Sequence, residues 1–408
     1  MTLKTTLLAA TACLAFGASV VATASPTLCT VKSSGGDDAP ALIAALQSCP
    51  KVTVPKDTVL SIRSPMNTTD LSNVHLSLEG TLKYYDDVDY WATNSFPFEF
   101  QATYTFWMLG GKDILVDGGG TIDGSGETWW QAWTINSTVV RPIPLTIFKG
   151  KRVVVANISM IQPPNWFNLI HTSQDVLFTN VKLTAQATTV TPKNTDGWDT
   201  YRSDRVVIQD SVINNTDDCV SFKPNSTNIL VRNLICNGSH GISVGSLGQY
   251  PQYVDIVENI MIKNVSLSNV SNAARIKVWA GPNVGSGRVN NVTWDGIPVT
   301  NADQAITFDQ CYFNVSDELC KEYPSRVNIS NILLRGVAGT SSGKLKALTA
   351  SIKCSPGAVC SNIVVDDFNV TPPSQYGAAT TICENLTICG SSALQFNCTG
   401  TGSGQACS

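Results

Sequence analysis

The sequence predicts an all-β protein: a single-domain, right-handed parallel β-helix with a capped N-terminal end. One observation is that short, β-branched runs ending near an Asn or Asp recur along the chain, for example at 152–158, 175–181 and 205–211. A second is the constant step of 22 residues from Asp196 to Asp218 and from Asp218 to His240. Repeats of roughly 20 to 50 residues are typical of solenoids, whose stacked coils bury one continuous core.

The N-terminal residues 1–24 have the composition of a secretory signal peptide. They contain one lysine, an apolar run and a small-residue cleavage pattern at Ala22–Ala24. We therefore expect a mature chain that begins near residue 25 and is secreted to the extracellular space. No other stretch is long and apolar enough to span a bilayer, so no membrane partner is expected.

Residues 25–100 are less regular than the rest, and we expect them to cap the solenoid, because an open end exposes unpaired strand edges. A length of 408 residues would usually suggest two or three compact domains. The sequence contains no Pro/Ser-rich linker and no charge run that would divide it. Residues 25–408 are therefore expected to form one domain.

Further copies of the repeated run lie at 228–234, 259–265, 290–296, 331–337 and 362–368. The runs are short and alternating, and turn residues separate them, which favours strands over helices. The steps between successive markers are 23, 30, 23, 31 and 31 residues when the markers are Asn157, Asn180, Asp210, Asn233, Asn264 and Asp295.

Cysteine usage fits an oxidising compartment, since removal of Cys13 with the signal peptide leaves twelve cysteines. A zinc site is not expected, because the chain has no Cys-x-x-Cys pair and only three histidines. Proximity in sequence predicts the disulfides Cys29–Cys49, Cys219–Cys236, Cys311–Cys320, Cys354–Cys360, Cys383–Cys389 and Cys398–Cys407.

Many Asn-x-Ser/Thr sequons are present, although Asn ladders are also ordinary turn chemistry in a β-helix. We expect N-glycosylation at a minority of them. The net charge of −4 provides no basic surface, so nucleic acid is not an expected partner. The candidate sequons are Asn67, Asn136, Asn157, Asn225, Asn264, Asn269, Asn291, Asn328 and Asn369.

Three carboxylates and an imidazole are predicted to meet on one face of the solenoid. Residues one coil apart lie about 4.8 Å from each other, so the 22-residue steps bring Asp196, Asp218 and His240 together, with Asp217 beside them. An isolated Asp-Asp pair is more often a solvated turn, but this register favours an acid/base site. Clustered negative charges disfavour full ionisation and help keep one carboxyl protonated. His240 is expected to support the carboxylates.

Arg275 and Lys277 are two residues apart on a predicted strand, so both side chains point to the same face. Arg binds a carboxylate through two hydrogen bonds and Lys adds a point charge, which suits an acidic substrate. The alternative is an ordinary surface ion pair. Lys223 is a weaker candidate for the same task, and no cofactor or metal is expected.

Four blocks of the sequence resemble those of glycoside hydrolase family 28, the polygalacturonases. They are Asn194-Thr195-Asp196, Asp217-Asp218-Cys219, Ser239-His240-Gly241 and Arg275-Ile276-Lys277. Thr216 and Ser239 stand where many members have glycine. The resemblance implies inverting hydrolysis of the α-1,4-galacturonosidic bonds of pectin, in which acid and base usually stand roughly 6.5 to 9.5 Å apart.

The resemblance also implies roles for these residues. Asp217 would be the general acid, and Asp196 and Asp218 would share the role of general base. Asn194, Arg275, Lys277 and Lys223 would bind polygalacturonate. The expected protein is a monomer whose partner is the pectic polysaccharide.

Residues 194–203 and 221–225 are most similar to the secreted, exo-acting fungal branch, which releases galacturonic acid from the non-reducing end. Exo action needs a wall at one end of the cleft, for which residues 84–91 are a candidate. Four alternatives stay open at this point: an endo-polygalacturonase, a xylogalacturonan hydrolase, a calcium-dependent pectate lyase and a non-catalytic cell-wall-binding solenoid.

Overall fold

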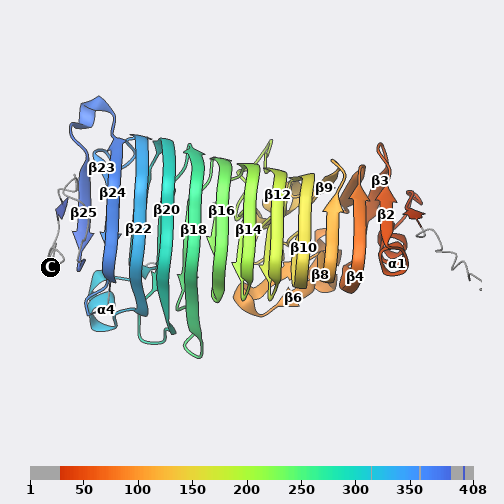
Figure 1. The fold of residues 1–408 in the computed structure, drawn as a ribbon, viewed down its shortest axis with the longest axis horizontal. Coiled ribbons are helices and arrows are strands. Elements are labelled where there is room, and N and C mark those ends of the chain that lie inside the picture. Colours follow the sequence, from red (N-terminus) through yellow and green to blue (C-terminus); the bar gives the residue numbers. More distant parts are fainter. Residues whose placement is uncertain (1–27, 314, 358–359, 387–397, 400–408) are drawn as a thin grey trace, which may run out of the picture.

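The computed structural model describes residues 28–313, 315–357, 360–386 and 398–399, and within them one solenoid runs from end to end (Figure 1). A single sheet network of 24 strands connects its coils, and all of the strand pairings in that network are parallel. The predicted right-handed parallel β-helix is confirmed. The predicted signal peptide lies outside the described residues.

One series of strands forms the length of the solenoid, and each strand pairs in parallel with the next member of the series. From β4 onward these strands are long. The series is β1 (Leu28–Thr30), β2 (Lys51–Val54), β4 (Met66–Leu78), β8 (Trp107–Asp117), β10 (Leu145–Ile161), β12 (Gln174–Thr184), β14 (Asp204–Asn214), β16 (Ser226–Asn237), β18 (Val254–Ser268), β20 (Ser286–Ala302), β22 (Arg326–Ser341) and β24 (Cys360–Thr371).

A second series of shorter strands forms another face. It starts on the first residues of β10, where Leu145 pairs with Asn168, and it carries the candidate site. The strands are β11 (Asn168–His171), β13 (Trp198–Tyr201), β15 (Asp218–Phe222), β17 (Gly241–Leu247), β19 (Asn272–Trp279), β21 (Gln304–Tyr312), β23 (Leu348–Lys353), β25 (Thr380–Glu384) and β26 (Cys398–Thr399).

The core is built from columns of apolar side chains, one from each coil. In one column every side chain is at most 2 % exposed, and each packs between its counterparts in the coils before and after. No single coil could bury such a face, so the stacking itself creates the core. The column contains Val155, Phe178, Ile208, Val231, Ile262, Trp294, Leu334 and Val365.

The repeat marker at Asp295 is wrong by one residue. Asp295 pairs with Lys263, which places Gly296 opposite Asn264. The run at 290–296 is displaced by one residue in the same way, because Trp294, its fifth residue, aligns with Ile262, the fourth residue of the run at 259–265. Gly296 has a φ of +71° and Asn264 a φ of +53°. The marker is therefore a corner that requires a left-handed residue, and glycine fills it as readily as asparagine.

A second left-handed corner lies five residues before this marker, for example at Asn259 before Asn264. Asn is the residue other than glycine that adopts this conformation most easily. Side-chain amides link successive corners: Asn259 donates to Asn228 and Asn291 donates to Asn259, each at 2.9 Å. The residues with positive φ at this corner are Asn73, Asp113, Arg152, Asp175, Arg205, Asn228, Asn259, Asn291, Asn331 and Asn362.

The N-terminal end is closed by α1 (Ala39–Ser48), which buries Leu42 and Leu46 against the first coils. Coil stacking already begins between β1 and β2, within the region expected to be irregular. Three short strands complete these first coils, and β9 continues along the end of β10. They are β3 (Val59–Ile62), β5 (Thr81–Tyr84) and β9 (Thr121–Asp123).

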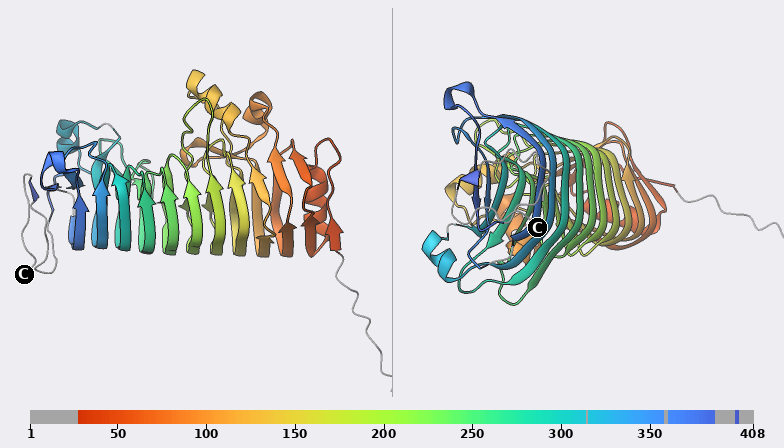
Figure 2. Two further views of the ribbon diagram at one scale, coloured as in Figure 1. Left: turned by 90° about the horizontal axis from the view of Figure 1, so that it is seen from above. Right: turned by 60° about the vertical axis from the view of Figure 1, so that its left-hand side comes forward.

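Helical excursions project from one side of the solenoid, one group above its middle and N-terminal half and another at its C-terminal end (Figure 2). In the first group, β6 and β7 form an antiparallel hairpin whose turn contains η1. The excursions contain α2 (Val88–Asn94), β6 (Phe96–Phe98), η1 (Phe100–Ala102), β7 (Thr103–Thr105), α3 (Glu127–Ile135), α4 (Asp317–Glu322) and η2 (Ser374–Tyr376).

Four of the expected disulfides are present: Cys29–Cys49, Cys219–Cys236, Cys311–Cys320 and Cys354–Cys360. The other two expected bonds involve Cys389 and Cys407, which lie outside the described residues. Among the helices that the structure describes, none is long and apolar enough to cross a membrane.

The candidate sequon at Asn225 is poorly placed for glycosylation. Its side chain is only half-exposed, and its Oδ1 accepts a hydrogen bond from the backbone N–H of Ile256 at 3.2 Å. The remaining candidate asparagines are exposed.

Replacing Ile262 with alanine tests the column packing. The substitution opens a cavity between Val231 and Trp294, and we expect the free energy of unfolding to fall by about 2–5 kcal/mol. Chemical denaturation measures this. Lys263→Ala, on the exposed neighbour, is the control and should change stability by less than about 0.5 kcal/mol. A loss below about 1 kcal/mol for Ile262→Ala would contradict the column.

Candidate active site

Backbone hydrogen bonds between coils bring three of the four predicted blocks together. The N–H of Gly197 donates to the carbonyl of Asp218 at 2.9 Å, and the N–H of His240 donates to the carbonyl of Asp217 at 2.8 Å. Asp196 precedes β13, Asp218 begins β15 and His240 precedes β17. The 22-residue steps therefore place these side chains at the same edge of three successive strands.

The buried amide of Asn215 fixes the two aspartate-bearing turns to each other. Its Nδ2 donates to the carbonyls of Thr195 at 2.8 Å and of Asp217 and Asp218 at 3.0 Å. The residues that depart from the family pattern also hold these turns: the Thr195 and Thr216 hydroxyls are 3.0 Å apart, and Ser239 donates to the Asp217 carbonyl at 2.9 Å.

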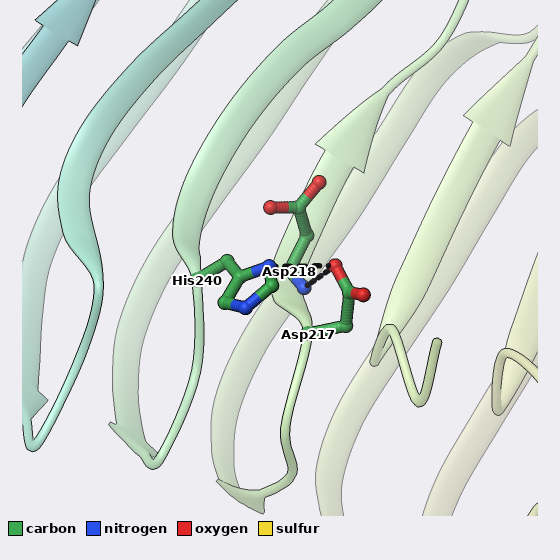
Figure 3. Close-up of side chains that lie close together, drawn as sticks. All are labelled: Asp217, Asp218 and His240. Carbon is green, nitrogen blue, oxygen red and sulfur yellow. Dashed lines mark hydrogen bonds and ion pairs between the residues drawn. The ribbon is translucent and has the colours of Figure 1, made fainter. Parts of the chain in front are cut away.

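Asp217 and His240 form a pair, and the Asp218 carboxylate points away from it (Figure 3). His240 Nδ1 lies 3.0 Å from Asp217 Oδ1, which also accepts from the N–H of Asp218 at 2.8 Å. Burial raises the pKa of Asp217, but the hydrogen bond and charge of His240 outweigh it, so the pKa is lowered. Burial lowers the pKa of His240, but the hydrogen bond and charge of Asp217 reverse this and raise it.

Asp218 is fully buried, and protein groups satisfy both of its oxygens. Lys277 Nζ lies 2.6 Å from Oδ2, and the Ser243 hydroxyl donates to Oδ1 at 2.6 Å. Burial alone would raise the pKa of Asp218, but the charges of Lys277, Lys223 and Arg275 hold it well below the usual range. Asp218 is therefore an ionised carboxylate at any working pH.

A fourth carboxylate, Asp199, joins the cluster. Lys223 Nζ is 3.0 Å from Asp199 Oδ1 and 3.9 Å from Asp196 Oδ2. Burial, followed by the charges of Asp217 and Asp199, raises the pKa of Asp196 well above its ordinary value. Burial raises the pKa of Asp199 to about 7 against the opposing charge of Lys223.

A cavity of about 630 Å³ opens above the cluster. Asp196 and Asp217 reach its surface, whereas Asp218 does not line it and lies beneath. Asp196 Oδ1 has no hydrogen-bond partner among the described protein atoms. The predicted residues that line the cavity are Asn194, Asp196, Asp217, Lys223, His240, Arg275 and Lys277.

Arg275 lines the cavity with a charge that remains available to bind a substrate. In the described part of the chain no carboxylate lies within 4.0 Å of its guanidinium, which sits 5.7 Å from the Tyr312 ring centre. Lys277 and Lys223 differ, because each is buried against aspartates. The predicted pair of carboxylate-binding cations is thus one half-exposed arginine and one lysine already in a buried ion pair.

Several residues of the site were not predicted from the sequence. Asp199 lies within the segment 194–203, and its position three residues after Asp196 could have indicated that it belongs to the site. Arg141 donates to Asn194 Oδ1 at 2.7 Å, and Trp166 packs with its ring centre 4.9 Å from Lys223 Nζ. Neither is part of a repeated run, so the repeat pattern gave no signal for them.

A wall closes one side of the cavity, and it is not the segment that the sequence suggested. Tyr84 and Trp91 are buried in the core instead. The wall is η1, where Gln101 Nε2 donates to Gln249 Oε1 at 3.2 Å and the Gln101 N–H donates to the Tyr250 hydroxyl at 3.1 Å.

An aromatic contact anchors this wall to the solenoid. The rings of Phe100 and Tyr201 are stacked with their centres 4.0 Å apart. Phe100 and Tyr201 belong to a small apolar cluster with Ile143, Trp166 and Leu169, separate from the main core. The wall therefore has its own packing and is not a loose loop.

The donor set does not suit calcium. Asp217, Asp218 and His240 each place one ligand atom within 4.8 Å of the others. Calcium takes six to eight oxygen ligands, but Lys277 and Ser243 occupy the oxygens of Asp218, and His240 offers nitrogen. This arrangement disfavours a calcium-dependent lyase.

Sequence comparison places residues 47–398 in "Glycosyl hydrolases family 28". An exopolygalacturonase of Cochliobolus carbonum is 44 % identical over 91 % of this chain and 86 % of its own length. Exopolygalacturonase A of Aspergillus niger is 41 % identical over 88 % of this chain and 86 % of its own.

Structure comparison gives a consistent result. The endo-xylogalacturonan hydrolase of Aspergillus tubingensis superposes with a TM-score of 0.81 at 32 % identity, over 93 % of this chain and all of the other. An exopolygalacturonase of Thermotoga maritima shares the fold, with a TM-score of 0.66 at 16 % identity over 89 % of this chain and 91 % of the other.

The raised pKa of Asp199 predicts how folding stability changes with pH. Below about pH 4 the carboxyl is protonated in both the folded and unfolded states. As the pH rises toward 7, only the unfolded chain ionises, so the free energy of unfolding falls, by at most about 4 kcal/mol. Asp199→Asn should flatten this decrease in denaturation curves recorded from pH 4 to 7.5.

Asp57→Asn is the matched control, because Asp57 is an exposed carboxylate on a turn outside the cluster. It should keep the wild-type pH dependence. Identical pH profiles for the wild type and Asp199→Asn would show that Asp199 does not hold a proton in the folded protein.

Proposed function

Because this chain belongs to glycoside hydrolase family 28, we propose that it is an exopolygalacturonase, which hydrolyses α-1,4-galacturonosidic bonds of polygalacturonate from the non-reducing end with inversion. The observation that carries this proposal is one cavity that combines three elements. It holds the aspartate cluster, it presents the available guanidinium of Arg275, and η1 closes one of its sides.

Asp217 acts as the general acid in this proposal. It lines the cavity, and its Oδ1 shares a 3.0 Å contact with His240 Nδ1. The raised pKa of His240 keeps the imidazole protonated in mildly acidic solution, so the pair carries one proton. A negatively charged substrate beside Asp217 raises its affinity for that proton, which then passes from Nδ1 to Oδ1 and on to the glycosidic oxygen.

Asp196 takes the role of general base, with Asp218 as its support. Asp196 lines the cavity, and its buried Oδ1 has no hydrogen-bond partner among the described residues, which leaves an acceptor for a water admitted from the cavity. Its raised pKa makes it a stronger base once it is ionised. Asp218 does not line the cavity, and one of its carboxylate oxygens lies within 4.8 Å of an Asp217 oxygen, closer than the usual acid–base separation of roughly 6.5 Å or more.

Substrate binding rests chiefly on Arg275, whose planar guanidinium can bind a galacturonate carboxylate through two hydrogen bonds. Lys277 adds positive charge from below while it neutralises Asp218. Lys223 also adds positive charge, 3.0 Å from Asp199 and 3.9 Å from Asp196. Asn194 bridges Arg141 and Asp217, at 2.7 and 3.4 Å, and so helps to orient the acid.

Exo action is favoured by the wall and by the names of the relatives that are 41–44 % identical. With one side closed by η1, a chain can place only its terminal unit between the wall and the aspartates. The endo-acting neighbour is less similar in sequence, at 32 % identity.

We also propose that the enzyme is secreted, glycosylated at some of its exposed sequons, and monomeric, with the pectic polysaccharide as its partner. The signal-like segment 1–24 and four disulfides support secretion. Recovery of the protein from the culture medium would test secretion, and its mass before and after enzymatic deglycosylation would test glycosylation. Light scattering would test the monomeric state.

Asp217→Asn should lower kcat on polygalacturonate by about 100- to 10,000-fold with little change in KM, because the amide cannot donate the acidic proton. It should also remove the alkaline limb of the pH–rate profile, which the His240–Asp217 pair sets. Asn214→Asp, a neighbouring polar change outside the cavity, is a control for folding. A variant that retains more than about a tenth of wild-type kcat would exclude Asp217 as the acid.

Removal of the wall should change the products. Phe98 and Thr103 are paired across the hairpin, so an Asn-Gly turn can replace residues 99–102. We expect digalacturonate and longer oligomers among the early products, which chromatography resolves, where the wild type gives galacturonic acid alone. Gln101→Ala, which keeps the wall backbone, should still give mostly monomer. An unchanged product profile after wall removal would contradict its role.

A further inference from the structure

The row of side chains that begins with Lys277 continues beyond the candidate active site. Lys277 on β19 pairs with Asp309 on β21, Asp309 pairs with Lys353 on β23, and Lys353 pairs with Glu384 on β25. Paired residues of neighbouring parallel strands point the same way and lie about 4.8 Å apart. Asp309, Lys353 and Glu384 therefore follow the site along the same face of the solenoid.

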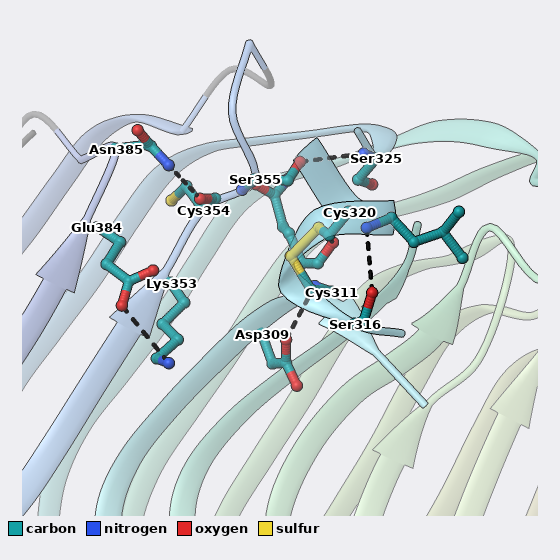
Figure 4. The surroundings of a disulfide bond; sticks show 12 residues. Asp309, Cys311, Ser316, Cys320, Ser325, Lys353, Cys354, Ser355, Glu384 and Asn385 are labelled. Atoms are coloured by element: carbon teal, nitrogen blue, oxygen red, sulfur yellow. Dashed lines mark hydrogen bonds and ion pairs between the residues drawn. A yellow bond between two sulfur atoms is a disulfide. The ribbon is translucent and has the colours of Figure 1, made fainter. Parts of the chain in front are cut away.

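A second cavity, of about 600 Å³, lies over this row. The strands supply its floor, and α4 and the Cys311–Cys320 disulfide supply one wall (Figure 4). It adjoins the first cavity, because Cys311 lines one and the next residue, Tyr312, lines the other. With η1 closing the other side of the site, this cavity is the open direction for a bound chain.

The charges in the second cavity differ from those around Arg275. Lys353 Nζ lies 3.5 Å from Glu384 Oε1, so the cation on the strands already has a carboxylate partner. Asp309 accepts a hydrogen bond from the Cys311 N–H at 2.8 Å, and no ion pair to it is formed within the described residues. The other charged lining residues, Asp317 and Lys321, balance each other on α4.

The buried surroundings of Asp309 disfavour a further negative charge, such as that of a bound galacturonate, next to its carboxylate. Burial raises the pKa of Asp309, more than the Cys311 hydrogen bond and the charges of Lys353 and Arg275 lower it. In its ionised form the Asp309 carboxylate accepts hydrogen bonds from sugar hydroxyls but repels an ionised galacturonate beside it. A methyl-esterified unit keeps the hydroxyls and lacks the charge.

We propose that this second cavity receives the saccharide units on the leaving side of the scissile bond and selects units without a negative charge, so that the enzyme prefers pectic chains that are methyl-esterified there. The proposal rests on the proposed exopolygalacturonase function, and it adds a substrate preference. The acidic unit is required at Arg275, and the esterified units lie over Asp309 and Lys353.

The test compares two tetragalacturonates, one unesterified and one methyl-esterified on its two reducing-end units, by release of galacturonic acid. We expect kcat/KM to be higher for the esterified substrate by about fourfold, the effect of a like charge about 5 Å away in a water-like dielectric. Asp309→Asn should remove most of this difference by improving hydrolysis of the unesterified substrate. Lys353→Gln should increase the difference.

Asp295→Asn is the matched control, because Asp295 lies on β20, pairs with Arg335 and lines neither cavity. It should leave the ratio of the two kcat/KM values unchanged. Equal kcat/KM values in the wild type, or a ratio unaffected by Asp309→Asn, would overturn the proposed selection. If neither tetragalacturonate releases galacturonic acid, the proposed function itself fails, which is a separate outcome.

Discussion

The parallel hydrogen bonding between successive coils is the constraint on which the rest of this structure depends. It holds each residue about 4.8 Å from its counterpart in the next coil and keeps their side chains on the same face. The core column around Ile262 and the asparagine ladders at the corners both follow from it. The same register turns two intervals of 22 residues into an acid/base cluster.

The ionisable groups of the site form two layers, one buried and one at the surface of the cavity. The buried layer pairs Lys277 with the ionised Asp218 and places Lys223 3.0 Å from Asp199, whose pKa of about 7 keeps it protonated in acidic solution. The surface layer contains Asp196, Asp217 and His240, whose protons can be exchanged with a substrate. Burying so many carboxylates is costly for folding unless each has a partner or a proton. The raised pKa values of Asp196 and Asp199 show where protons supply that compensation.

The sequence predicted the fold and the central residues because both are periodic. Strand runs and the steps between Asp196, Asp218 and His240 are visible without a structure, and the marker failed only where glycine replaces asparagine at a corner, next to Asp295. Non-periodic parts were invisible. The wall at η1, Arg141 and Trp166 come from excursions whose positions depend on tertiary packing, such as the stacking of Phe100 on Tyr201. The partner of Lys277 was also unpredictable, because spacing shows which face a side chain points to but not which atom it reaches.

Inverting exo-hydrolysis is tested most directly by following the wild-type protein on polygalacturonate by proton NMR at early times, which reports both the size and the anomeric form of the first product. We expect galacturonic acid released as the β-anomer, since inversion at an α-linkage gives β, with little early loss of chain length. An α-anomer, a ladder of oligomers or an unsaturated product would each contradict an inverting exo-hydrolase built on Asp217 and Asp196.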